Sequence, residues 1–457
     1  MPRLPGLAAL TLLLACEPAA SERPATPTAL TPTPPLPDPF SEPWLLAQAT
    51  RYLDDPAARR TALERSLQNP QNHYSRTRLG SYGHTTFGWD LLPPWNPRTL
   101  PVTAARVAEL RERRLDLTAA TPLWDGQRPR TLAAWVALGE RVFFSYPLRP
   151  EIFAEHAITR PELAAAVGLP TAPDGTFPGT VAFVDIDGEP RVGITCALCH
   201  STVESGRLVA GRARREFDYG RMRLAYSSDT GAAIDPELAR RMQGWGPGRA
   251  DITEDDDEDP VAIPDLWQLR DHDALTQAAT LRHRSLGADA PLALAIRQET
   301  QILHANRERT RPPRELAWAL AMYLYSLAPP PSPTVATDAV TRGRAIFDRD
   351  CTSCHSDPDG AGPAIAAADI GTDPALALGT SRGTGLYRPA PLTAVAMAAP
   401  YLHHGVVPSL ESLFDPARLQ PSYTGGAHGP GPIPGHLPGT ELPATSRDDL
   451  IAYLRTR

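Results

Sequence analysis

The sequence predicts a mainly α-helical protein in which one domain architecture occurs twice. A helical extension precedes the first copy, and a small β-hairpin is inserted in it. Three observations support this. A motif of two cysteines and a histidine occurs at residues 196–200 and again at 351–355, a G-x-x-x-F helical pattern precedes each motif, and a segment containing Tyr-Leu closes each half. A repeat on this scale indicates a duplicated domain.

Both motifs have the form C-x-x-C-H, which is the attachment pattern of a c-type haem. Two thiols at this spacing can bond to the two vinyl groups at one edge of a porphyrin, and the adjoining histidine supplies a nitrogen ligand to the iron. The sequence therefore predicts two covalently attached haem c groups in two cytochrome-c-like domains. The residues are Cys196, Cys199 and His200 for the first haem, and Cys351, Cys354 and His355 for the second.

Two other interpretations of the cysteine pairs stay open. Four thiolates can bind structural zinc, but paired zinc motifs usually lie about 15–20 residues apart, and these motifs lie a whole domain apart. A redox-active dithiol requires no adjoining histidine. The fifth cysteine is Cys16, so no thiols are left for a disulfide framework.

Length and charge limit the classes of partner. A chain of 457 residues accommodates two or three domains. The 45 basic residues, all arginine, and 52 acidic residues give a net charge of −7. This balance disfavours nucleic acid as a partner.

The N-terminus resembles a bacterial export signal. Arg3 precedes a short apolar run that ends at Cys16 and is too short to span a bilayer. We interpret residues 1–15 as a lipoprotein signal peptide, cleaved to leave a lipidated Cys16 that anchors the protein to a membrane; an ordinary signal peptide is the alternative. Covalent haem is attached outside the cytoplasmic membrane. The predicted location is therefore periplasmic or cell-surface, with a periplasmic electron donor or acceptor as partner.

Composition divides the rest of the chain into segments. We expect a Pro/Thr-rich tether over 16–40, a helical extension over 41–130, a first haem domain over 131–328, a linker over 329–335 and a second haem domain over 336–457. Helices are expected to begin at Ser41, at Asp55-Pro56 and at Thr131, and to cover residues 103–115 and 161–167. A capping box at Ser446 and Asp449 predicts the start of the last helix. A hairpin is expected over 180–195, and residues 69–100 are expected to be irregular.

Longer motifs resemble the bacterial di-haem cytochrome c peroxidase/MauG superfamily over residues 131–457. They are Leu138-Gly-Glu-Arg-Val-Phe-Phe before the first haem motif, Tyr387-Arg-Pro-Ala-Pro-Leu, and Pro400-Tyr-Leu-His-His-Gly followed by Pro408-Ser-Leu-Glu-Ser-Leu. The short stretch Gly246-Pro-Gly-Arg249 resembles the rubber-oxygenase branch. The resemblance implies redox chemistry at two haems.

The second axial ligand decides what each haem does, because methionine or histidine favours electron transfer whereas an open position admits peroxide or oxygen. For the second haem the candidates are His403, His404 and Met397. The resemblance favours His403 over Met397, and the alternative is that His403 only hydrogen-bonds a loop. His428 and His436 lie in a Gly/Pro-rich loop and are expected to be solvated.

For the first haem, His283 is favoured because the segment around it loosely repeats the layout before His403. Relatives place a histidine shortly after the first motif, yet none occurs here from 201 to 271. Peroxidase-type ligand exchange is therefore in doubt. Met222, Met242, His272 and an open position stay as alternatives.

Four further features have possible roles. Trp245 and Trp267 are candidates for electron transfer between the haems, as a tryptophan does in the family, with plain packing as the alternative. Arg249 is a candidate partner for a haem propionate. The acidic run 254–259 could bind calcium, as some relatives do, although it lacks EF-hand spacing and a solvated loop is the alternative.

These observations support three functions. The first is a lipid-anchored di-haem cytochrome that transfers electrons between periplasmic redox partners. The second is enzymatic, with hydrogen peroxide reduced at the first haem. The third is oxygenase chemistry at the first haem, which the rubber-oxygenase resemblance suggests.

Overall fold

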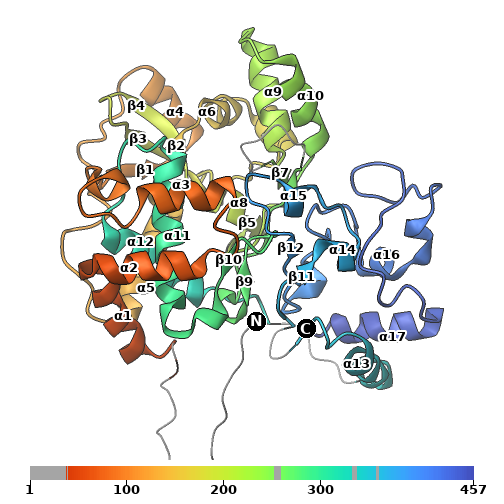
Figure 1. Cartoon of the computed structure of the whole chain (residues 1–457). Helices are drawn as coiled ribbons and strands as arrows, with labels where there is room; N and C mark the ends of the chain where they lie inside the picture. The colour runs from red at the N-terminus through yellow and green to blue at the C-terminus, as the bar shows by residue number, and fades with distance from the viewer. Residues whose placement is uncertain (1–37, 39, 252–258, 332–336, 357–359) are drawn as a thin grey trace, which may run out of the picture. The chain divides into compact units, whose positions relative to one another are not determined.

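The computed structural model describes residues 38, 40–251, 259–331, 337–356 and 360–457. The predicted signal peptide, Cys16, nearly all of the tether, and most of the acidic run and of the linker lie outside these ranges. Helices make up most of the regular structure, as predicted (Figure 1). Within the described ranges, none of the helices has the length and apolar character needed to cross a membrane.

The predicted extension begins with helices on both sides of Asp55. The Asp55 carboxylate accepts hydrogen bonds from the backbone N–H groups of Ala57 and Ala58, which caps the second helix as the sequence predicts. Residues 69–100 were expected to be irregular, and this was wrong, because Asn72 caps a further helix there. The helices are α1 (Glu42–Asp54), α2 (Pro56–Ser66), α3 (His73–Ser81), the 3-10 turn η1 (Gly88–Leu91) and α4 (Ala104–Arg111).

The helix predicted from Thr131 is α5 (Leu132–Ser145), and Thr131 caps it. It packs on α12 (Arg314–Ser326), which is preceded by α11 (Ala290–Ala305). The two helices cross at Gly139, where an added Cβ would overlap the carbonyl oxygen of Ala319 and approach Tyr323. The side chain of Phe143 then lies against Tyr323, with ring centroids 5.3 Å apart.

The predicted hairpin forms the centre of a four-stranded antiparallel sheet with strand order β1-β3-β4-β2. Two very short strands extend the hairpin on its two sides, and they carry too few residues to show a strand pattern in the sequence. The strands are β1 (Thr99–Pro101), β2 (Arg149–Pro150), β3 (Thr180–Val184) and β4 (Pro190–Ile194).

Short elements surround the first C-x-x-C-H motif, whose last four residues form α8 (Ala197–His200). A two-stranded hairpin follows it directly, and α9 and α10 form a helical hairpin further on (Figure 1). The elements of this region are α6 (Ile152–Ile158), α7 (Pro161–Ala166), β5 (Ser201–Glu204), β6 (Arg207–Ala210), α9 (Tyr219–Thr230), α10 (Pro236–Trp245), β7 (Arg249–Ala250), β8 (Val261–Ala262), η2 (Leu269–Asp271), β9 (Ala274–Leu275), β10 (Leu281–Arg282) and η3 (Arg284–Asp289).

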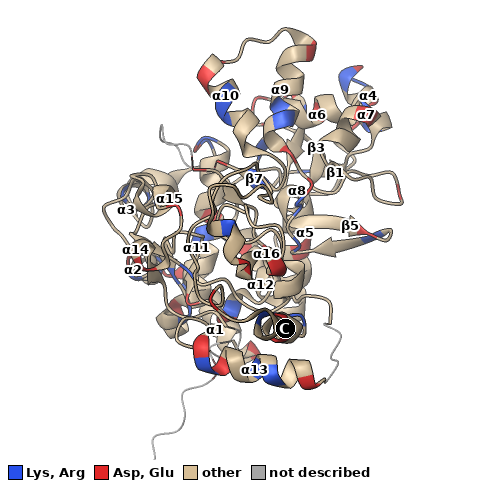
Figure 2. Cartoon of the chain, turned by 90° about the vertical axis from the view of Figure 1, so that its right-hand side faces the viewer, with Lys and Arg blue, Asp and Glu red and all other residues tan. Residues whose placement is uncertain are grey.

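In the C-terminal part, α13 (Asp338–Asp350) packs on the last helix, α17 (Ala444–Leu454). The outward face of α13 carries alternating basic and acidic residues (Figure 2). The capping box predicted at Ser446 and Asp449 was wrong, because α17 begins earlier and Asp449 pairs with Arg342 at 2.7 Å. Between the two helices lie β11 (Ile365–Ala366), α14 (Ala367–Ile370), α15 (Ala375–Leu378), β12 (Leu386–Tyr387), η4 (Val395–Met397), α16 (Leu410–Phe414) and η5 (Pro416–Leu419).

Candidate haem-binding site

Helix α13 positions the second motif. It ends at Asp350, and the backbone N–H of Cys351 still bonds the carbonyl of Phe347. The chain then turns so that Nδ1 of His355 lies 2.8 Å from the carbonyl oxygen of Gly360. A carbonyl only accepts, so Nδ1 carries the proton and Nε2 keeps its lone pair for a metal ion.

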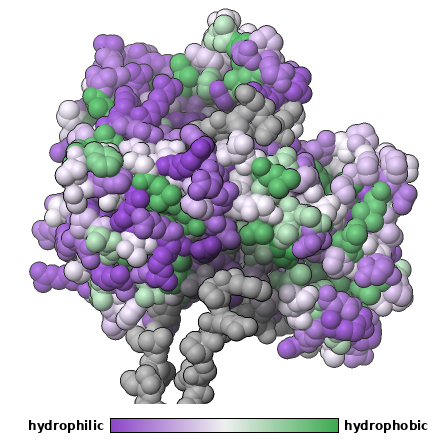
Figure 3. All heavy atoms as spheres, viewed as in Figure 1, coloured by the Kyte–Doolittle hydropathy of each residue, from purple (hydrophilic) through white to green (hydrophobic). Residues whose placement is uncertain are grey.

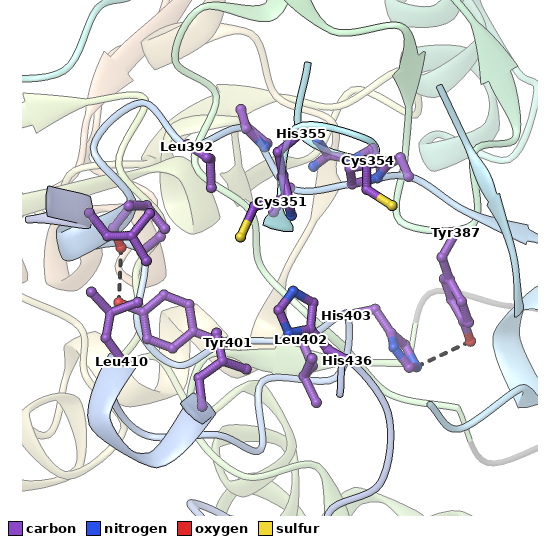
Figure 4. A pocket seen from close by; sticks show the side chains of 18 of the residues that line it. Cys351, Cys354, His355, Tyr387, Leu392, Tyr401, Leu402, His403, Leu410 and His436 are labelled. Atoms are coloured by element: carbon purple, nitrogen blue, oxygen red, sulfur yellow. Dashed lines mark hydrogen bonds between the residues drawn. The ribbon is translucent and has the colours of Figure 1, made fainter. Parts of the chain in front are cut away.

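Cys351, Cys354 and His355 line a large cavity of the C-terminal part (Figure 4). Most of its wall is apolar, which suits a porphyrin face and excludes water from the iron. Phe347, the phenylalanine of the G-x-x-x-F pattern before this motif, is part of this wall. The apolar side chains come from α13, α16, α17 and the loops between them, and include Phe347, Leu392, Val395, Leu402, Leu410, Leu413, Phe414, Leu450 and Leu454.

Burial sets the protonation of the groups in this cavity. It raises the pKa of the Cys351 thiol to about 11. It lowers the pKa of His355 and lowers that of His436 to about 4. At neutral pH the thiol is therefore protonated, and both imidazoles are neutral, which is the form that binds iron.

His436 faces His355 across the cavity. The two ring centroids lie 6.2 Å apart and the ring planes make an angle of 58°. Nδ1 of His436 is buried and has no hydrogen-bond partner among the described residues. The sequence suggested a solvated loop histidine, and this was wrong, because the Gly/Pro-rich loop folds inward over the cavity.

His403, predicted as the second axial ligand of this haem, also lines the cavity (Figure 4). Its ring stacks on Tyr387 with centroids 4.3 Å apart, and Nε2 lies 3.2 Å from the Tyr387 hydroxyl. The alternative ligand Met397 packs against the large core cluster that contains α5 and α12. Iron ligation by His403 stays a prediction.

The first motif repeats the arrangement of the second. Nδ1 of His200 lies 3.0 Å from the carbonyl oxygen of Pro264, which again leaves Nε2 for a metal. Burial lowers the pKa of His200 to about 4 and raises the pKa of Cys196 to about 12 and of Cys199 to about 11.

His283, predicted as the second ligand of the first haem, is fully buried and held at both ring nitrogens. Nε2 lies 2.7 Å from the Tyr325 hydroxyl and Nδ1 lies 3.1 Å from the His272 carbonyl. Ligation by His283 would break one of these contacts. Of the alternatives, Met222 lies in the hydrophobic cluster that also contains Leu198 and contacts Cys199.

One short segment contacts both motifs. Pro264 accepts the hydrogen bond from His200, and Pro264, Asp265 and Trp267 all line the cavity of the second motif. The Trp267 indole N–H donates to the carbonyl of Ala210, just after the first motif, at 3.1 Å. Trp245, the other predicted candidate, stacks on Tyr219 in the α9–α10 region.

Two arginines line the same cavity. Arg215 is paired with Asp265 at 2.8 Å. Arg388 is half-buried, its Nε is buried and has no hydrogen-bond partner among the described residues, and loss of solvent lowers its pKa to about 10. Its NH1 lies 3.4 Å from Nδ1 of His272. Arg249, which was predicted to pair with a propionate, is itself buried and bonds the carbonyls of His404 and Gly244, so propionate binding by Arg249 stays a prediction.

Within the described ranges, no cluster of three or more His, Cys, Asp or Glu side chains is suited to a metal ion by itself. The two cysteine pairs therefore do not combine into a zinc site. All but Asp259 of the acidic run lies outside these ranges, so calcium binding there stays a prediction.

Comparison with known proteins identifies the C-terminal part. Residues 340–457 match the model of the family described as Cytochrome c. One similar solved structure is that of a MauG-like protein associated with microbial copper homeostasis, which is 20% identical in sequence. The match covers 47% of this chain and 81% of the MauG-like chain, with a TM-score of 0.30. No curated protein matches. The Cytochrome c match over residues 340–457 agrees with the cytochrome-c-like domain predicted there from the sequence.

The residues of the C-terminal cavity fit a covalent haem. The two cysteines and His355 stand together at an apolar cavity, a second neutral histidine faces His355, and the Arg388 guanidinium has no carboxylate partner among the described residues. Residues 340–457 are therefore a cytochrome c domain that carries covalent haem c with iron, and the protein is a haem-dependent redox protein.

Proposed function

We propose that the chain carries two haem c groups and transfers electrons between them and a periplasmic redox partner. The observation that carries this proposal is the matched construction of the two halves. In each half a glycine of the first helix packs on a backbone carbonyl of the last, at Gly139 on Ala319 and at Gly343 on Asp449.

The similarity between the two helix pairs extends by one more helical turn. Tyr323 and Tyr453 each follow the contacted carbonyl by four residues and each pack on a phenylalanine of the first helix. The centroid distances are 5.3 Å for Phe143–Tyr323 and 5.4 Å for Phe347–Tyr453. Equal helix crossings and equally oriented motif histidines support a duplicated cytochrome c domain.

His355 and His436 would hold the iron of the second haem. Two metal–nitrogen bonds of about 2 Å each place the ligating atoms about 4 Å apart. The ring centres lie farther back, in keeping with the observed 6.2 Å between centroids. Bis-histidine iron is low-spin and suited to one-electron transfer. His403 then bonds Tyr387 beside the haem.

The segment 264–267 provides the contact between the two haem sites. His200 bonds the carbonyl of Pro264. Trp267 lines the second cavity and donates a hydrogen bond to Ala210 at the end of β6, in the hairpin that follows the first motif. We assign electron transfer between the haems to this segment. The export signal and Cys16 of the sequence place the protein, in this proposal, on the periplasmic side or cell surface as a lipoprotein.

A haem count tests the two-haem proposal. The wild-type protein is expected to give two haems per chain in a pyridine haemochrome assay, and the double variants C196S/C199S and C351S/C354S one each. A single haem in wild type, or no loss in C196S/C199S, would refute it. The H436A spectrum tests the axial pair, because loss of a strong ligand converts one ferric haem from low-spin to high-spin.

Peroxide reduction at the first haem is a second candidate function. It is favoured because His283 is held at both ring nitrogens and is not available to cap that iron. A high-spin EPR signal that persists in C351S/C354S, together with peroxide turnover in wild type, would support it. If only low-spin signals and no peroxide turnover are observed, peroxide reduction is refuted and electron transfer is the function that remains.

A further inference from the structure

Arg418 is a buried arginine whose contacts all lead to the backbone. It is fully inaccessible to solvent and follows α16, in the turn η5. Its guanidinium donates hydrogen bonds to four carbonyl oxygens, those of Leu413, Ile433, Gly435 and His436. Within the described residues these hydrogen bonds all go to backbone carbonyls, whose dipoles compensate the charge together with the nearby Asp415 carboxylate.

Three of those carbonyls belong to the four residues that end at His436. The backbone of Arg418 binds the same loop, because its carbonyl accepts from the N–H of Ile433 at 2.7 Å. One side chain thus fixes both the start and the end of this short segment. A lysine cannot replace it, because a single ammonium does not span the positions of a planar guanidinium fork.

The segment needs such a restraint because its backbone is unfavourable by itself. His436 has φ of +48°, a left-handed conformation that non-glycine residues rarely adopt. Gly435 lies directly against the backbone of Thr372, where an added Cβ would come within 2.6 Å of the Thr372 Cα. The N–H of His436 is held by the carbonyl of Ile370 at 2.9 Å. The loop is therefore fixed on two sides.

We propose that Arg418 is the positioning residue for the His436 ring opposite His355. This inference rests on the proposed assignment of His355 and His436 as axial ligands. By holding the carbonyls on both sides of the Gly435–His436 peptide bond, Arg418 presents the imidazole to the cavity in one orientation. Without it, the loop is free to relax toward solvent and the iron–His436 bond opens more often.

Carbon monoxide binding to the reduced full-length protein tests this inference. In wild type, His436 must leave before carbon monoxide binds the second haem, so binding there is slow. H436A defines the rate and amplitude of the open site. We expect R418K to bind carbon monoxide at least about tenfold faster than wild type, since a lost hydrogen bond to a charged group of about 1.5–3 kcal/mol corresponds to about tenfold or more.

A matched control is Arg447, a half-buried arginine of the same domain that bonds the carbonyl of Phe414 at 3.2 Å, outside residues 433–436. R447M is expected to keep the wild-type rate. R418M should exceed R418K, and added imidazole should restore its low-spin spectrum. Haem content and circular dichroism confirm that each variant is folded.

The outcomes separate the two proposals. If H436A has the wild-type spectrum, His436 is not a ligand, and both the axial assignment and this inference fail. If H436A turns one haem high-spin but R418K and R418M bind carbon monoxide as wild type does, the axial pair stands and this inference fails. Loss of folded protein in both Arg418 variants, with R447M intact, would assign Arg418 to domain stability and also overturn it.

Discussion

At Arg388 a guanidinium with a buried Nε lies in the wall of the C-terminal cavity, 3.4 Å from the neutral imidazole of His272. A buried charge of this kind is stable only when an anion joins it. A haem propionate supplies one, and the positive charge in turn favours the reduced haem, whose iron carries one positive charge less.

R388Q is therefore expected to lower the reduction potential of the second haem. A charge effect of about 1 kcal/mol corresponds to roughly 40 mV for one electron, so we expect a shift on the order of 50 mV. A spectroelectrochemical titration measures it. R149Q, which removes an arginine paired with Glu151 in the first half, is the control. An unchanged potential in R388Q would contradict propionate binding at this position.

The Trp267 indole lines the second cavity and donates a hydrogen bond to Ala210 of β6, in the hairpin after the first motif. W267L removes both the aromatic ring and its hydrogen bond, and we expect slower electron transfer between the haems. W267F, which keeps a ring, should lose less. Stopped-flow reduction followed at both haems measures the rate, with W245F as the control. Equal rates in W267L and wild type would exclude Trp267 from the route.

At the scale of elements, the two helix crossings depend on glycine. At Gly139 and Gly343 an added Cβ would overlap a carbonyl oxygen of the partner helix and approach the Cβ of a tyrosine, and side-chain rotation moves none of these atoms away. Each pair of helices would have to separate and lose side-chain packing.

G139A and G343A are each expected to lose about 1–3 kcal/mol of unfolding free energy, the usual cost of overpacking. G80A is the matched control, because Gly80 lies in helix α3 with nothing within 4 Å of an added Cβ. Alanine is the better helix former, so G80A should gain about 0.5–1 kcal/mol. Urea denaturation measures all three, and a stable G343A would refute the close crossing.

The sequence predicted many elements because their signals are local. The cap at Asp55, the Thr131 helix and the 180–195 hairpin all carry their own start or turn residues. Helix α3 was missed because its residues show no apolar stripe, and its single buried tyrosine, Tyr74, packs through tertiary contacts. The start of α17 was predicted too late in the chain, because Asp449 forms an ion pair with Arg342 and does not cap the helix.

At the scale of the molecule, charged residues of both signs are interspersed over the surface (Figure 2). Apolar residues gather on the face around α14, α15 and β12 (Figure 3), where Leu378 at the end of α15 is 68% exposed. In contrast to these surface residues, His272 and His283 are almost completely buried and uncharged.

Buried histidines predict how stability depends on pH. Burial lowers the pKa of His283 to about 4, whereas an unfolded histidine titrates near ~6.5. Between these values the unfolded chain binds one more proton, so stability is fully present above pH ~6.5 and falls as the pH falls, by about 1.4 kcal/mol per pH unit for each such histidine.

H283Q should reduce this slope by about that amount, whatever its effect on stability at neutral pH. Urea denaturation at pH 7 and pH 5 provides the measurement. H73Q removes an exposed histidine and serves as the control. An identical slope in H283Q and wild type would show that His283 is not buried as a neutral ring.

The sequence by itself determined the covalent chemistry, because two cysteines and a histidine at fixed spacing define a haem site within five residues. It also determined the helices and the hairpin that carry their own caps and turns. Only the tertiary structure decided which histidine faces His355 and which arginine lines the same cavity with a buried, unpaired Nε. His436 and Arg388 are distant in sequence from the motif they serve, and no local pattern encodes a contact that forms only when the Gly/Pro-rich loop closes over the cavity.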